Sequence, residues 1–180
     1  MFTLKPVSKL FMFAFFICLA VGQLQAQSFE QPSEGKSLVY FVRSSGTGAL
    51  VNFKYFDGET FLGKNNGVHY FKYECEPGEH LFWIASENRD FLKADLKPNA
   101  TYVFEARPTM GAFKAAARLY PVAPNNEKML KRINKLMSKR APTQLKGLDD
   151  DMAFFIKSGM ERYEKIKDDV KVLDNSWTFN

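Results

Sequence analysis

The sequence predicts a mainly β protein: an antiparallel β-sandwich of immunoglobulin-like or related topology, followed by a C-terminal α-helical extension. Between residues 38 and 123, short runs of alternating apolar and polar residues are interrupted by turn residues. The interruptions come roughly every eight to twelve positions, which is typical of a sandwich or barrel. Aromatic residues make up 15% of the chain, and this suits sheets with bulky inward faces. After Pro124 the apolar period becomes that of an α-helix.

Residues 1–27 have the three parts of a secretory signal peptide. Lys5 and Lys9 give a basic start without acids, residues 11–22 form an apolar run, and Ala26 is a small residue at the expected cleavage site. The run falls short of the roughly 20 apolar residues of a spanning helix, which disfavours an uncleaved anchor. Bulky residues precede Cys18 and disfavour its lipidation. We therefore expect an exported bacterial protein, periplasmic or extracellular and associated with the envelope.

The exported part, residues 28–180, is long enough for one domain with its own core. Without Lys5 and Lys9 the formal net charge falls from +5 to +3, which is too weak for the footprint of a nucleic-acid-binding protein. No second apolar stretch predicts a transmembrane segment. Cys75 is then the only cysteine, so we expect no internal disulfide and a buried, inert thiol.

The β-sandwich domain is predicted to cover residues 38–123, after a polar and flexible lead-in at 28–37. Its strands are expected at 38–43, 50–56, 60–63, 68–75, 80–87, 91–96, 101–107 and 113–122. Asp57-Gly58 predicts a tight hairpin turn between the second and third strands. Residues 76–79, with the sequence Glu-Pro-Gly-Glu, predict another turn between the fourth and fifth strands.

Residues 124–180 predict two amphipathic helices and a tail. Asn126 is a candidate N-cap for a helix at 127–140, whose apolar stripe is Met129, Leu130, Ile133, Leu136 and Met137. In the second helix, residues 149–151 are all Asp and are expected in the first turn, where the helix dipole favours acids. Residues 170–179 are expected to form a short strand or a docked tail.

Several phrases between residues 36 and 122 resemble, in order, a bacterial family of exported proteins, domain-of-unknown-function family 2846. SLVYFVRSSGTG resembles its opening strand and loop, and LKPNATYVFEA resembles its penultimate turn and strand. FDGETFLGKNNGVHYFKYECEPGEHLFW resembles its hairpin and its Pro-Gly-x-His turn. The resemblance implies an exported β-sandwich module. It implies no activity and no catalytic residues.

No arrangement of residues predicts a catalytic centre or a metal site. His69 and Cys75 would lie about 20 Å apart on an extended strand, too far to share an ion. His80 would pair across the predicted hairpin with Cys75 or Glu74, or hydrogen-bond to the turn, which we favour. Neither histidine has a marked nucleophile as partner. Glu74, Glu76 and Glu79 cluster at one turn and are expected to be solvated. We expect no enzyme, no metal and no cofactor.

The strongest physical signal is the basic side of the first predicted helix. At about 100° per residue, five cations share the sector opposite the apolar stripe: Lys128, Lys131, Arg132, Lys135 and Lys139. One interpretation is a surface for an anionic partner, either a protein or lipid. The simpler one is a helix docked by its stripe, with a solvated basic face. In the second helix, Phe154 falls away from the apolar side and is a candidate partner contact.

We therefore expect a non-catalytic binding or structural module of the cell envelope. Its partner would be another envelope protein, reached through the tail helices or a sheet edge, with peripheral contact to an anionic surface as a further option. One alternative is a small-ligand or glycan binder with an outward row of aromatics, Tyr40, Tyr70 and Trp83. The other is a hydrolase whose paired carboxylates meet only in space.

Overall fold

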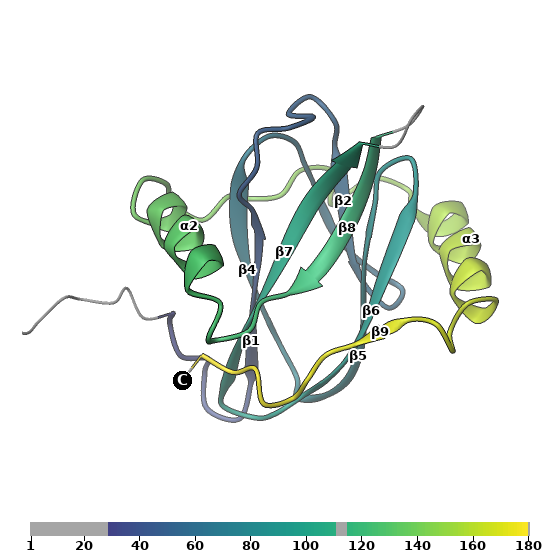
Figure 1. The fold of residues 1–180 in the computed structure, drawn as a ribbon. Helices are drawn as coiled ribbons and strands as arrows, with labels where there is room; N and C mark the ends of the chain where they lie inside the picture. Colours follow the sequence, from purple (N-terminus) through teal and green to yellow (C-terminus); the bar gives the residue numbers. More distant parts are fainter. Residues whose placement is uncertain (1–28, 111–114, 180) are drawn as a thin grey trace, which may run out of the picture.

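The computed structural model describes residues 29–110 and 115–179, which form two β-sheets, two helices and a C-terminal tail (Figure 1). The predicted signal peptide lies outside the described residues. The helices are α2 (Glu127–Met137) and α3 (Ala153–Glu164). The strands are β1 (Ser37–Arg43), β2 (Phe53–Asp57), β3 (Thr60–Asn65), β4 (His69–Cys75), β5 (Gly78–Ala85), β6 (Arg89–Leu96), β7 (Ala100–Met110), β8 (Ala115–Pro121) and β9 (Lys171–Val172). The prediction of a mainly β chain with C-terminal helices is confirmed.

Sheet A has the strand order β4-β1-β7-β8, and sheet B has the order β3-β2-β5-β6-β9. Most neighbouring strands are antiparallel, but β1 pairs with β7 and β6 pairs with β9 in parallel. The expectation of antiparallel pairing is wrong for these two pairs. Both join strands that are far apart along the chain, so the connections are long enough for the crossover that parallel strands require.

The inward faces of both sheets meet in one hydrophobic core, and aromatic rings dominate it. Phe41 of β1 lies at its centre. Its ring makes edge contacts with those of Tyr55, Phe82 and Phe104, at centroid distances of 5.6–5.7 Å. Each of these four side chains is fully buried, and full burial of such a ring stabilises the fold by about 2–3 kcal/mol. The alternation in the sequence therefore marks the residues that point into this core.

The second strand begins later than predicted because a buried arginine binds the preceding loop. Residues 50–52 belong to that loop rather than to β2. Arg43 has no exposed surface, and its guanidinium donates to the carbonyl oxygens of Gly48 (2.7 Å) and Val51 (2.8 Å). The same group lies 3.9 Å from the centre of the Phe53 ring. These carbonyls accept from the buried cation, which would be costly to leave unpaired.

The turn between β4 and β5 does not form the predicted hairpin. β4 belongs to sheet A and β5 to sheet B, so residues 76–77 carry the chain from one sheet to the other. Gly78 follows with a φ of 113°, which glycine adopts easily. His80 therefore does not face Glu74 across a ladder. A local turn signal identifies the reversal of the chain but not the sheet to which the next strand belongs.

The segment between the two helices contacts one edge strand of each sheet, β4 in sheet A and β3 in sheet B. At the β4 edge, the backbone N–H of Thr143 donates to the carbonyl oxygen of Tyr70 (2.7 Å). At the β3 edge, Lys146 and Lys64 exchange two backbone hydrogen bonds of 2.9 Å. Leu145 packs against the shared core between these two points. These contacts occupy part of each of these two strand edges.

The C-terminal tail returns from sheet B to sheet A. β9 pairs with β6, Trp177 packs against the shared core, and the N–H of Phe179 donates to the Thr101 carbonyl (2.9 Å). Phe179 also contacts the ring of Phe29, at a centroid distance of 4.8 Å. Both predictions for this segment, a short strand and a docked tail, are confirmed. Within the described residues, no helix has the length and apolar character needed to cross a membrane.

Candidate functional site

The helix α2 is fixed to the outer face of sheet A by its apolar stripe. Met129, Ile133 and Leu136 are buried there. They pack against the outward side chains of β1, β4 and β7, which are Leu38, Tyr40, Val42, Tyr70 and Val103. Asn126 caps the helix as predicted, because its Oδ1 accepts from the N–H of Met129 (3.2 Å). The apolar stripe is therefore used for docking, as the simpler interpretation expected.

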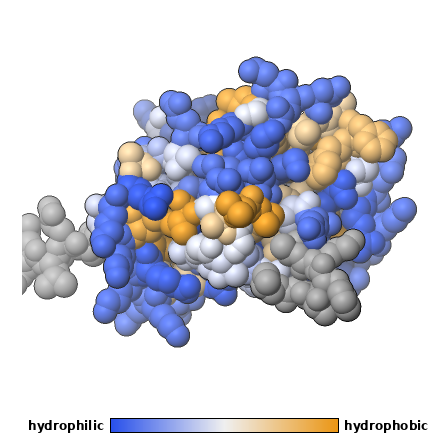
Figure 2. Space-filling model, turned by 90° about the horizontal axis from the view of Figure 1, so that it is seen from above, coloured by the Kyte–Doolittle hydropathy of each residue, from blue (hydrophilic) through white to orange (hydrophobic). Residues whose placement is uncertain are grey.

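Lys128, Lys131, Arg132 and Lys135 lie on the opposite side of α2 and are exposed. The helix predicted at 127–140 ends at Met137, so Lys139, also exposed, lies just after the C-cap residue Ser138. Six of the residues from 127 to 140 are basic and one is acidic. Within the described part of the chain, no ion pair neutralises Lys128, Lys131, Arg132, Lys135 or Lys139. The surface over this helix, at the left of Figure 2, is accordingly hydrophilic. The structure thus brings the predicted site residues together on one rigid, positively charged face, hereafter the α2 face.

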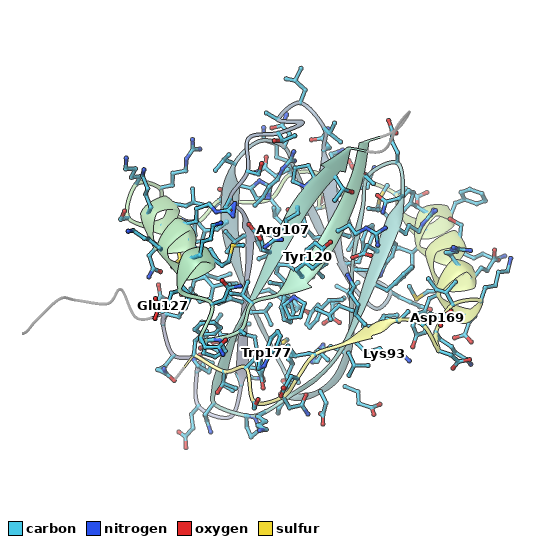
Figure 3. The ribbon with its side chains drawn as sticks, in the orientation of Figure 1. Lys93, Arg107, Tyr120, Glu127, Asp169 and Trp177 are labelled. Carbon is cyan, nitrogen blue, oxygen red and sulfur yellow. The ribbon has the colours of Figure 1, made fainter. Side chains whose placement is uncertain are left out.

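A third contact of α2 connects this face to the strands beside it. Arg107 of β7 donates to Glu105 and lies 4.0 Å from the sulfur of Met129. Its guanidinium is also 4.9 Å from the centre of the Tyr120 ring on β8. Figure 3 shows Arg107 and Tyr120 on the face of sheet A between the two helices. Arg107 therefore connects the apolar side of α2 to β7 and β8, while its own charge is paired with Glu105.

The helix α3 covers the outer face of sheet B and lies very close to it. Trp83 is fully buried and stacks on Phe56, at a centroid distance of 3.7 Å. A Cβ atom on Gly159 of α3 would lie 2.7 Å from the Trp83 ring, so only glycine permits this approach. The two helices thus cover opposite faces of the molecule, as Figure 1 shows.

The start of α3 differs from its prediction. The three aspartates precede the helix, which begins at Ala153 rather than at 149. Asp151 accepts from the backbone N–H of Ala153 (3.0 Å), and Asp150 forms an ion pair with Lys64 (2.5 Å). These acids therefore hold the preceding turn against β3. Phe154 is 86% exposed, which confirms that it points away from the packed face.

The predicted aromatic row does not form a ligand platform. Tyr40, Tyr70 and Trp83 do point outward from their sheets, but their exposed fractions are 1%, 6% and 0%. Helix α2 covers the two tyrosines and α3 covers the tryptophan. The alternation of the strands identified the correct faces. It could not show that the helices bury them.

The two histidines have opposite electrostatic environments. Burial lowers the pKa of His69 to about 4, and its ring lies between the Gly67 carbonyl (3.0 Å) and the Tyr55 hydroxyl (2.9 Å). His80 bonds to the turn as favoured, through the Glu76 carbonyl (2.8 Å), and its Nδ1 lies 2.7 Å from Asp57. The hydrogen bond to Asp57 raises the pKa of His80 to about 10. His80 is therefore a charged, structural histidine.

The predicted glutamate cluster is dispersed. Glu76 pairs with Lys36, and Glu74 accepts from the Ser33 N–H (2.8 Å). Glu79 instead lies opposite Asp95 across the β5–β6 ladder. No group of three metal-binding side chains occurs within the described ranges.

Two surface hollows lie away from α2, and no residue of that helix lines either of them. The first has a volume of about 490 Å³ and lies over β5 and β6, with Glu79, Lys93, Asp95 and Tyr163 among its lining residues. The second has a volume of about 380 Å³ and lies between β6, β8 and the end of α3. Each is lined by residues far apart in the sequence, so no local motif could have predicted either.

Comparisons with known proteins add no relative. No protein-family model and no curated protein matches the chain. The resemblance of residues 36–122 to domain-of-unknown-function family 2846 therefore stays a prediction.

Proposed function

We propose that this protein is an exported, non-catalytic binding module of the bacterial cell envelope, which holds an acidic partner protein through the α2 face. The scaffold would be an immunoglobulin-like β-sandwich of the kind that the resemblance to family 2846 implies. The observation that carries the proposal is the set of five exposed cations on α2 and directly after its C-terminal end, for which the described residues supply no counterion, on a helix docked against sheet A.

Immobilisation favours a protein partner over a lipid bilayer. A helix that binds a bilayer surface places its apolar side among the acyl chains. In α2 that side is occupied, because Met129, Ile133 and Leu136 are buried against the sheet. The exposed side offers charge without an apolar anchor. A fixed row of charges suits an acidic protein surface, since long-range attraction speeds the encounter and a defined geometry selects the partner.

Site-specific photocrosslinking tests the proposal in envelope preparations. A crosslinking residue is placed at Lys131 in one variant and at Lys157, an exposed lysine of α3, in a second. We expect an acidic protein to be captured from Lys131 and not from Lys157, and the yield to fall as salt is added. Equal capture from both positions, or capture from Lys157 alone, would contradict the proposal.

A second candidate function is the binding of a small ligand or glycan in the hollow over β5 and β6. The ring of Tyr163 borders this hollow, and Glu79, Lys93 and Asp95 supply polar groups to it. An aromatic ring beside a few polar groups is the usual composition of a small-ligand site. Tyr163→Ala would then abolish retention on the glycan that wild-type protein selects from an array, whereas Lys131→Glu would leave it unchanged.

A further inference from the structure

The hollow between β6, β8 and the end of α3 has more cations than acids in its lining. Its volume is about 380 Å³, and Arg89, Arg118, Arg162 and Lys171 contribute to its lining. Two acids, Asp90 and Asp169, also line it. These residues come from the strands β6, β8 and β9, from α3 and from the chain between α3 and β9, so only the folded molecule brings them together. Some of these charges already have partners within the molecule.

Asp90 and Lys171 neutralise each other and hold two sheet edges together. The Asp90 carboxylate accepts from the N–H of Leu119 (2.7 Å) and from the Lys171 ammonium (2.5 Å). Lys171 also donates to the Leu119 carbonyl (2.5 Å). These bonds satisfy the outer edge of β8, which has no strand beside it there. Both charges are therefore part of the scaffold.

The three arginines retain unused hydrogen-bonding capacity. Arg118 is 55% exposed, and its only ion pair with a described residue is a contact of 3.6 Å with Asp90. Arg162 is exposed and forms no ion pair within the described ranges. Arg89 donates to Ser158 (2.6 Å) and lies 4.4 Å from the Phe155 ring, while its buried Nε finds no partner in the described part of the chain. A buried donor without a partner is unusual and costly.

We propose that this hollow binds the phosphate group of a small organic phosphate. Guanidinium groups from β6, β8 and α3 supply donors from three sides, and their planar forks match phosphate oxygens. Phe91, Ile166 and Val170 form an apolar wall beside them for the organic part of the ligand. The lining holds four cations against two acids, Asp90 and Asp169, the latter in the chain that follows α3 (Figure 3). The site is separate from the α2 face and does not depend on the proposed function.

The test is calorimetric titration of residues 28–180, which keep every described element, at constant ionic strength. The probes are inorganic phosphate, glycerol 3-phosphate and vesicles of phosphatidylglycerol. We expect saturable binding at one site for both soluble phosphates, with glycerol 3-phosphate the tighter because of the apolar wall. The variant Arg118→Gln/Arg162→Gln should weaken it about tenfold or more, since it removes two of the charged groups that would donate to the phosphate. Lys128→Gln/Lys131→Gln, a matched control on α2, should bind like the wild type.

A second readout keeps the result clear if the double variant is impaired in folding. The Nε–H resonance of Arg89 in the wild-type protein should shift as inorganic phosphate is added, with the same midpoint as the heat. Absence of saturable binding of both soluble phosphates would overturn the proposal. So would equal weakening by the α2 control variant, or binding of the vesicles alone, because a lipid surface would then be the ligand.

Discussion

His69 predicts a specific loss of stability in mild acid. Its side chain is buried, donates from Nδ1 to the Gly67 carbonyl and accepts from the Tyr55 hydroxyl at Nε2, so the folded state holds it neutral. The folded pKa is about 4, against 6.5 for an unperturbed histidine. The unfolded chain binds the proton more readily than the folded protein does. The contribution of neutral His69 to the free energy of unfolding is therefore fully present above pH 6.5 and is lost as the pH falls toward 4.

The size of this effect follows from the shift in pKa. One pKa unit corresponds to about 1.36 kcal/mol, so the complete loss is about 3.4 kcal/mol, of which about 2.5 kcal/mol is reached by pH 4.5. That is a large part of the stability of a typical domain, about 5–15 kcal/mol. Urea unfolding, followed by tryptophan fluorescence at about pH 7.5 and pH 4.5, measures it directly.

The matched comparison uses two histidine variants. His69→Gln cannot titrate, so its free energy of unfolding should fall between the two pH values by about 2.5 kcal/mol less than that of the wild type. His80→Gln should lose more stability than the wild type between these two pH values, because the raised pKa of His80 makes its stabilisation grow as the pH falls from 7.5 to 6.5. If His69→Gln loses as much stability as the wild type, another group is responsible and the assignment to His69 is wrong.

Three further perturbations probe the scaffold. The hydrogen bond to Asp57 raises the pKa of His80 to about 10, so the stabilisation from this pair is complete below pH 6.5 and is lost as the pH rises through 10. In urea titrations, the free energy of unfolding of Asp57→Asn should therefore decline less with rising pH than that of the wild type. Gly159→Val should displace α3 from Trp83, lowering the free energy of unfolding by about 1–3 kcal/mol and red-shifting the fluorescence. Deletion of residues 174–180 removes Trp177 from the core and should lower the melting temperature by several degrees, as calorimetry would show.

The strands were predictable because their side chains face two distinct environments. In β1 and β5 the inward residues Phe41 and Phe82 lie in the shared core, and the outward ones are covered by helices or solvent. The alternation of apolar and polar residues along each strand indicates this difference from the local sequence alone. The assignment of β4 and β5 to opposite sheets depends on packing between residues far apart in the chain, so the Glu-Pro-Gly-Glu turn could not reveal it.

The candidate sites divide in the same way. The α2 face could be predicted because Lys131 and Lys135 are one helical turn apart, and helical periodicity places them on the same side. The arginine-lined hollow could not be, since Arg89, Arg118 and Arg162 are brought together only by the folding of β6, β8 and α3. Likewise, the outward direction of Trp83 follows from its strand, but its burial depends on Gly159 of α3.

Binding of an acidic protein by the α2 face can be tested with one affinity measurement. The dissociation constant of the crosslinked partner is measured for the wild type, for Lys131→Glu/Lys135→Glu, and for Lys157→Glu/Lys165→Glu, which makes the same charge change on exposed residues of α3 or its C-terminal end. We predict that the α2 reversal weakens binding about tenfold or more, with a reduced dependence on salt, while the α3 reversal has little effect. Equal weakening by both variants would show that the partner responds only to the net charge of the protein. No weakening by the α2 reversal would show that the α2 face does not bind the partner.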